Sequence, residues 1–465
     1  MLSTHNQARC RAEDSTRRPR SWTPAATALA LVMVLVSGAC RGDDGAAPPA
    51  SSSAATPTTN GAATDAPSAD GVLRIGFLYP ATGSQASLGP AMLAAAQLAV
   101  TELNDNGGIL GQPVELVAQD AGDATTDTAS ASLDQLSAAL VDVIIAPPSS
   151  GVTSLVLDQV ARSGAVLISA ANALEEPPSD VPYVQLAPSL ELLGRAVGEH
   201  LAAAGKTKTL IVARDDPFGQ RVSAAAATAL KDAGVAATVQ PYNAEAEVYT
   251  SDIAAAVAAK PARLVLIGYA ELAEFLAGLI AGGATPATVP TFVVSDRLDD
   301  ALFRRFTQPG ALTGVAAIGT GSEVASRQSG FAQQLAAAPA TANTTANTTA
   351  AGSAAARVLF AAESYDAVVI AALAAARARS DAPAAISDAA AAVTGGQDGD
   401  GCADAAACLA VLASGRDTLS YRGEGGPYRL DQDNVATAAT FARFPVGTDN
   451  KLATGQAEIF RVGDK

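Results

Sequence analysis

The chain has 465 residues, more than one hydrophobic core requires, so its length predicts two lobes or domains. Hydrophobic residues make up 49% of it and aromatic residues only 4%, a composition that favours helices packed closely on sheets. The net charge is −16, and residues 1–39 carry +3 from five Arg, one Glu and one Asp. The remaining chain therefore carries −19, the wrong sign for a nucleic-acid partner.

The first 39 residues have the features of an export signal. Arginines precede the apolar run AATALALVMVLVSGAC, which is shorter than the ~20 residues that a membrane-spanning helix needs. The ending VSGAC is typical of a lipoprotein signal peptide, in which Cys40 is lipidated and becomes the first mature residue; an ordinary signal peptide with an incidental cysteine is the alternative. Residues 40–71 are rich in Pro, Ser, Thr and Ala and predict a flexible tether. We therefore expect an exported protein, anchored to the outer face of the cell membrane through Cys40.

Strand and helix patterns alternate from Val72 onward. The first unit has expected strands at 72–80, 113–120, 141–147 and 165–170, and expected helices at 90–108, 128–140 and 150–164. A crossing segment follows at 183–189. In the second unit we expect strands at 209–215, 236–242, 263–269 and 291–296, and helices at 191–205, 219–234, 251–260 and 271–283. This alternation predicts an α/β protein with mostly parallel sheets covered on both faces.

The last part of the chain is less regular. A strand at 314–321 and a helix precede the low-complexity stretch 339–356, which predicts a surface loop. The apolar stretch 364–380 predicts a long buried helix that returns to the first unit. Residues 426–444 predict a hairpin of strands around Asp433 and Asn434.

A turn of small hydroxyl residues ends one apolar run, in IIAPPSSGVT. Ligands of open parallel sheets bind at the carboxyl ends of the strands, where this turn is expected to lie. The first N–H groups of the following helix have no internal partner and favour negative charge, so Ser149 and Ser150 are candidates for binding a carboxylate. The alternative is that a serine only caps the helix.

An α-amino acid would also need an acid for its ammonium group on the second unit. Asp296 ends the strand TFVVSD and could serve, although a helix cap is the alternative. Tyr269 ends RLVLIGY at a similar position and could lay its ring or hydroxyl on a ligand; its alternative is a half-buried aromatic between lobes.

Several segments together resemble a known family. In chain order these segments are IGFLYPATGSQASLGPAMLAAAQLAVTELNDNGGILGQPVELVAQDAGD, IIAPPSSGVT, VLISAAN, DDPFGQ, LVLIGY and SYDAVVIAALA. Together they are similar to the branched-chain amino acid (Leu/Ile/Val) substrate-binding proteins of ABC importers. The resemblance implies the type I periplasmic-binding-protein fold: two Rossmann-like lobes with parallel central sheets, joined by a three-crossover hinge. It places lobe 1 at 72–188 and 323–417, and lobe 2 at 189–322 and 418–465.

The resemblance also implies roles for individual residues. Ser150, beside Ser149, matches the serine that binds the ligand carboxylate, and Ala171 matches a backbone carbonyl that accepts from the ammonium. Tyr269 and Asp296 match the second-lobe tyrosine and acid. Three further positions depart from the family pattern and predict a more apolar pocket: Ala173 where Thr is common, Leu88 where an aromatic residue is common, and Phe218 where Tyr is frequent.

Cysteine and histidine content argues against an enzyme. Cys402 and Cys408 lie close together in an exported protein, so a disulfide is favoured over a metal pair. The segment CADAAAC is similar to a variant common in actinobacterial members of the family, in which the two cysteines are bridged. His200 is the one histidine after the signal segment, and no nucleophile elbow or phosphate loop is present, so no catalytic residue, metal or cofactor is expected.

We therefore expect a monomeric solute-binding lipoprotein that captures a small amino acid, or a related carboxylate or amide, by hinge closure. It would deliver this ligand to the permease and ATPase of an ABC importer. Two alternatives stay open: a receptor of the same fold that senses a ligand and signals to a membrane partner, and a scaffold lipoprotein whose cleft has degenerated.

Overall fold

The computed structural model describes residues 69–463 except 175, 177, 244–245, 247, 296–297, 299, 323, 325–329, 338–358 and 396–399. All of these described residues belong to one compact unit, Ala62–Lys465. The predicted signal peptide (1–39), Cys40, the tether up to residue 68, the loop 339–356 and Asp296 lie outside the described residues.

The first sheet is parallel throughout and has the strand order β2-β1-β3-β4-β5. Strand β3 has only three residues because Pro147 and Pro148 follow it closely and lack the N–H that a ladder needs. The five strands are β1 (Arg74–Tyr79), β2 (Glu115–Asp120), β3 (Val143–Ile145), β4 (Val166–Ser169) and β5 (Tyr183–Gln185).

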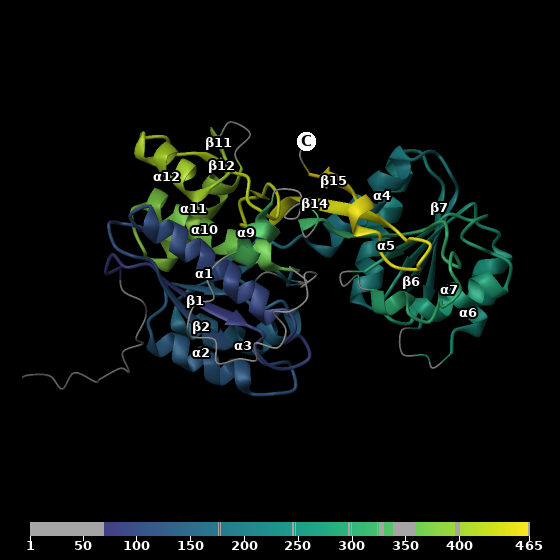
Figure 1. Cartoon of the computed structure of the whole chain (residues 1–465), viewed down its shortest axis with the longest axis horizontal. Helices are drawn as coiled ribbons and strands as arrows, with labels where there is room; N and C mark the ends of the chain where they lie inside the picture. The colour runs from purple at the N-terminus through teal and green to yellow at the C-terminus, as the bar shows by residue number, and fades with distance from the viewer. Residues whose placement is uncertain are drawn as a thin grey trace, which may run out of the picture. The chain divides into compact units, whose positions relative to one another are not determined.

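Helices cover both faces of this sheet, as the alternation predicts. One hydrophobic core joins the sheet to α1, α10 and α11, and a second core joins the opposite face to α2 and α3. Figure 1 shows α1 and α10 on one side and α2 and α3 on the other. The bounds are α1 (Gly89–Asp105), α2 (Thr128–Ala138), α3 (Ser150–Ser163), α9 (Phe331–Ala337), α10 (Ala361–Ala378), α11 (Pro383–Thr394) and α12 (Ala405–Ala413).

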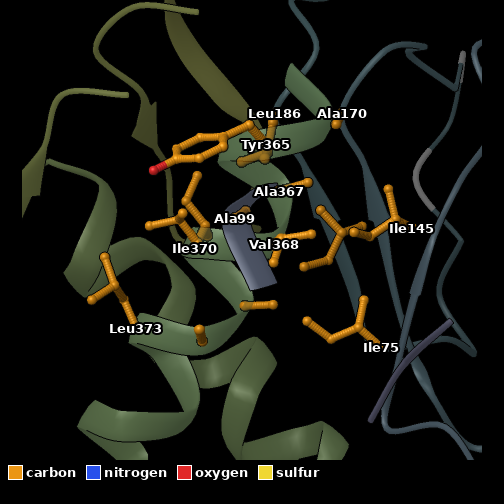
Figure 2. Close-up of a cluster of buried hydrophobic side chains, with 14 of the residues drawn as sticks. Ile75, Ala99, Ile145, Ala170, Leu186, Tyr365, Ala367, Val368, Ile370 and Leu373 are labelled. Atoms are coloured by element: carbon orange, nitrogen blue, oxygen red, sulfur yellow. The ribbon is translucent and has the colours of Figure 1, made fainter. Parts of the chain in front are cut away.

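Helix α10 is the centre of the first core. Every residue from Ala361 to Ala375 is buried, including Glu363 and Asp366 near the start of this otherwise mostly apolar helix. Figure 2 shows its side chains, among them Val368, packed between Ala99 of α1 and Ile75 and Ile145 of the sheet. The abundant alanines let these helices approach one another and the strands closely.

The second sheet has the strand order β13-β14-β10-β9-β8-β6-β7, and β15 pairs with β14. Strands β6 to β10 are parallel, whereas β13, β14 and β15 add an antiparallel edge, so this sheet is mixed. Its strands are β6 (Thr209–Arg214), β7 (Ala237–Tyr242), β8 (Arg263–Ile267), β9 (Thr291–Val294), β10 (Val315–Thr320), β13 (Arg429–Leu430), β14 (Ala436–Pro445) and β15 (Glu458–Val462).

Helices α4 (Leu190–Ala203) and α5 (Pro217–Asp232) cover one face of the second sheet, and α6 (Thr250–Ala258) and α7 (Leu272–Ala281) cover the other. Two glycines bring α4 and α5 together. A Cβ on Gly194 would lie 2.3 Å from the carbonyl oxygen of Val222, and one on Gly198 would lie 2.6 Å from that of Ala226. The short elements are β11 (Asp400–Cys402), β12 (Leu419–Tyr421), η1 (Asp300–Phe303) and η3 (Thr454–Gln456).

The C-terminal segment adds strands to the second sheet and side chains to the first core. The predicted hairpin is present as β13 and β14, and Asn434 in its turn has φ 57°, a conformation that Asn tolerates. Leu419, Tyr421 and Tyr428 pack in the first core, although the sequence-based limit at 418 assigns them to lobe 2. The exact lobe limits stay a prediction.

Candidate functional site

A cavity of about 770 Å³ lies where several parallel strands of both sheets end. Its walls include the segments that follow β3, β4, β5, β8 and β10. This is where open α/β sheets bind ligands, and the volume falls in the range of small-molecule sites. Six predicted ligand-binding residues line it: Leu88, Ser150, Ala171, Ala173, Phe218 and Tyr269.

The two serines of the Pro-Pro-Ser-Ser turn have different surroundings. Ser149 is the N-cap of α3, and its Oγ accepts a hydrogen bond from the N–H of Val152 at 3.4 Å. Its carbonyl oxygen accepts from the hydroxyl of Thr153 at 3.0 Å. Ser150 is exposed, begins α3 and lines the cavity. The capping alternative thus describes Ser149, while the hydroxyl of Ser150 is available to a ligand.

The loop after β4 forms the adjoining wall. Ala171 and Ala173 line the cavity, and so does Asn172 between them, which sequence reasoning missed. The hydroxyl of Ser169 donates to the carbonyl oxygen of Asn172 at 2.7 Å and fixes the bend of the loop. The available signal was a polar residue three positions after the end of a buried strand.

On the second sheet, the ring of Tyr269 lies between two neighbours. The guanidinium carbon of Arg214 is 4.6 Å from the ring centroid, and the ring of Phe218 stacks on it at 5.0 Å between centroids, with 20° between the planes. Both aromatic rings line the cavity. A tyrosine supported in this way has few orientations open to it, so it presents a fixed surface to a ligand.

Glu271 holds the backbone of Tyr269 and the side chain of Arg214 together. Its Oε1 accepts from Arg214 Nη1 at 2.7 Å, from the hydroxyl of Tyr242 at 2.8 Å and from the N–H of Tyr269 at 3.1 Å. Asp216 accepts from Arg214 Nε at 2.5 Å and caps α5 through the N–H of Gly219. Burial raises the pKa of Tyr242, which keeps its hydroxyl protonated as a donor to Glu271.

A third wall comes from α10 and the segment before β13. Asp366 of α10 is fully buried. Its carboxylate accepts hydrogen bonds from the hydroxyls of Tyr421 at 2.7 Å and Tyr428 at 2.8 Å. It also accepts from the backbone N–H groups of Glu424 at 2.9 Å and Gly425 at 2.7 Å. Burial raises the pKa of Asp366 to about 6, and these four donors oppose the shift. Because Tyr428 and Gly425 line the cavity, Asp366 fixes part of its surface.

Two predicted site residues, Leu88 and Asp296, and the histidine of the described chain remain to be placed. Leu88 is buried just before α1 and lines the cavity. Asp296 lies outside the described residues, so its pairing with an ammonium group stays a prediction. His200 lies in α4 and stacks on Phe460, with centroids 4.5 Å apart.

The predicted disulfide between Cys402 and Cys408 is present and joins β11 to α12. Among the described residues, no group of three or more His, Cys, Asp or Glu side chains could hold a metal ion. The helices that the structure describes include none long and apolar enough to cross a membrane.

A model of the periplasmic binding protein family matches residues 72–406, more than half of the chain. The Leu/Ile/Val-binding protein BraC3 of Rhizobium johnstonii is 34% identical over 105 residues, and the match spans 22% of this chain and 28% of that relative.

Two solved structures are similar in fold. One is LivJ, the substrate-binding protein of the branched-chain amino acid transporter of Streptococcus pneumoniae, which was solved with isoleucine. Its TM-score is 0.55 and its sequence identity 17%, and the match covers 84% of this chain and 99% of LivJ. A solute-binding protein of an ABC transporter from Rhodopseudomonas palustris, solved with 3,4-dihydroxybenzoic acid, has a TM-score of 0.57 and 14% identity over 85% and 99%. At these identities the likeness shows the fold, and the family model confirms the resemblance: the chain belongs to the periplasmic binding protein family, whose members bind solutes outside the cytoplasm.

Proposed function

We propose that this protein captures an amino acid, or a related small carboxylate or amide, and delivers it to an ABC importer. The observation that carries the proposal is that Ser150, the first residue of α3, lines a cavity at the carboxyl ends of parallel strands. The unpaired N–H groups and the dipole at the start of a helix favour a carboxylate there. The Leu/Ile/Val-binding relative and the isoleucine-bound LivJ support an amino acid as the carrier of that carboxylate.

The ammonium group of such a ligand would contact Tyr269, Asp296 and the carbonyl oxygen of Ala171. Leu88 and Phe218 would contact its side chain. Ala173 offers an N–H but no hydroxyl, so one hydrogen bond common in the family is missing, and leucine specificity does not transfer directly.

Closure of the two lobes on the ligand is the proposed mechanism. The proposed contacts are divided between residues of the first sheet and residues of the second, so only a form that makes all of them at once binds with full affinity. A ligand that binds this form better shifts the population toward it.

We further propose that the protein is held at the outer face of the membrane by a lipid on Cys40 and the tether 40–71. It would act there as a monomer with its permease and ATPase. The cavity of about 770 Å³ argues against the scaffold alternative, which expects side chains to fill the cleft.

Titration calorimetry of the exported protein, freed of bound ligand, against the 20 amino acids tests the proposal. We expect at least one to bind, and Asp296→Ala to weaken that binding by about 3 kcal/mol, roughly 100-fold, because an ammonium group would lose its counter-charge in the cavity. Circular dichroism checks that the variant is folded. Folded wild-type protein that binds none of the 20 would overturn the amino acid assignment, and an unchanged dissociation constant for the variant would refute the role of Asp296.

A further inference from the structure

The side chain of Asn172 connects two loops that line the cavity. Its Nδ2 donates to the carbonyl oxygen of Pro147 at 2.5 Å and to Oγ1 of Thr153 at 3.3 Å. The hydroxyl of Thr153 in turn donates to the carbonyl oxygen of Ser149 at 3.0 Å. The loop that carries Ala171 and Ala173 is thereby joined to the turn that leads into Ser150.

The orientation of this amide follows from its partner. A backbone carbonyl oxygen only accepts, so the group facing Pro147 must be the Nδ2 of Asn172. That leaves Oδ1 of Asn172 buried and without a hydrogen-bond partner among the described residues, in a residue only 7% exposed. A buried acceptor without a donor is unfavourable, so this arrangement is not the one that stability alone would select.

Asn450 offers a direct comparison. It also connects backbone segments, with Nδ2 donating to the carbonyl oxygens of Phe306 at 2.8 Å and Gln308 at 2.7 Å. Its Oδ1, however, accepts from the N–H of Leu312 at 3.2 Å, and the residue is 4% exposed. Asn450 satisfies all its hydrogen-bonding groups away from the cavity, whereas Asn172 leaves one unsatisfied beside it.

We propose that Asn172 is a positioning residue for ligand binding. It holds the Ser150 turn at a fixed separation from the Ala171–Ala173 loop before a ligand arrives, so that the carboxylate contact and the ammonium contact on this lobe are pre-arranged. Pre-arranged contacts raise affinity because less ordering remains to be done on binding. The identity of the ligand rests on the proposed function; the role of Asn172 in ordering the two loops does not.

Two variants and one control separate this role from ordinary structural support. Asn172→Leu keeps the branched shape and the number of heavy atoms of the side chain but removes both N–H donors. Thr153→Val removes the hydroxyl that links Asn172 to Ser149, and is the milder change. Asn450→Ala is the control, since it removes a similarly buried asparagine outside the cavity. Asn450 has φ 57°, so this variant also strains the backbone and is expected to unfold more easily.

Amide hydrogen exchange of the ligand-free exported protein is the first readout. We expect the amides of Val152 and Thr153 to exchange about tenfold faster in Asn172→Leu, and faster to a smaller degree in Thr153→Val, while Asn450→Ala leaves them unchanged. Unchanged exchange at Val152 and Thr153 in Asn172→Leu overturns the proposal, whether or not any amino acid binds.

Affinity is the second readout, measured with an amino acid that the wild type binds in the 20-member panel. We expect about a tenfold weaker dissociation constant for Asn172→Leu, and a value within twofold of wild type for Asn450→Ala even where that control unfolds more easily. Equal losses in both variants, or no loss in Asn172→Leu, would contradict the positioning role. A wild type that binds nothing refutes the proposed ligand only, because the exchange readout still decides the role of Asn172.

Discussion

Replacing Ser149 and Ser150 one at a time by alanine should separate stability from binding within one dipeptide. The hydroxyl of Ser149 accepts from the N–H of Val152 at 3.4 Å, longer than the usual range of 2.7–3.2 Å for such a bond. The cap is therefore weak, and Ser149→Ala should lower the free energy of unfolding by about 0.5 kcal/mol, the low end for N-caps. Its effect on ligand affinity should be small because Ser149 is not part of the cavity wall.

Ser150→Ala should do the reverse. The exposed Ser150 side chain lines the cavity, and a hydroxyl bound to a carboxylate contributes ~2 kcal/mol, which corresponds to about a 30-fold weaker dissociation constant. The free energy of unfolding should stay within ~0.5 kcal/mol of wild type, as for other exposed substitutions.

Urea unfolding followed by circular dichroism, together with calorimetric titration of the ligand, measures both quantities for both variants. Loss of affinity in Ser149→Ala equal to that in Ser150→Ala would refute the division of tasks. Full affinity in Ser150→Ala would refute the carboxylate role.

Three further predictions concern the surroundings of the cavity. Burial raises the pKa of Asp366 from 3.8 to about 6, so this group favours the folded state below pH ~4 and loses that contribution as pH rises through 6. Between pH 4 and 7 the wild type should lose about 2 kcal/mol of unfolding free energy relative to Asp366→Asn, and parallel urea profiles would contradict this. Replacing Cys402 and Cys408 by serine should lower the free energy of unfolding by about 2 kcal/mol, because the disulfide closes a short loop. Ligand affinity should not change because neither cysteine lines the cavity, and an altered dissociation constant would contradict this. Arg214→Met should weaken binding about tenfold by releasing the ring of Tyr269, and unchanged calorimetry would show that the ring needs no such support.

Local sequence patterns predicted most of the elements, because strand and helix periodicity is a short-range property. The buried helix α10, the Ser149–Ser150 turn and the hairpin around Asn434 are all present where the sequence places them. The turn was identifiable because two prolines end a strand immediately before a possible helix cap.

Contacts that join distant parts of the chain were not predictable in this way. Asn172 contacts Pro147 across 25 positions, Arg214 contacts Glu271 across 57, and Asp366 contacts Tyr428 across 62. Each pair meets because neighbouring strands or helices bring its two residues together, and a single sequence carries no mark of such pairings. The antiparallel edge of the second sheet was missed in part for the same reason, since β14 and β10 are far apart in sequence.

The central claim is that Ser150, at the start of α3, binds the carboxylate of the ligand. A crystal structure of the exported protein with its bound ligand tests this claim most directly. The account predicts a carboxylate oxygen within about 2.7–3.2 Å of the Ser150 hydroxyl or a first-turn N–H of α3, with the ammonium group facing Tyr269. A ligand held elsewhere in the molecule, or one whose carboxylate faces away from the start of α3, would contradict it.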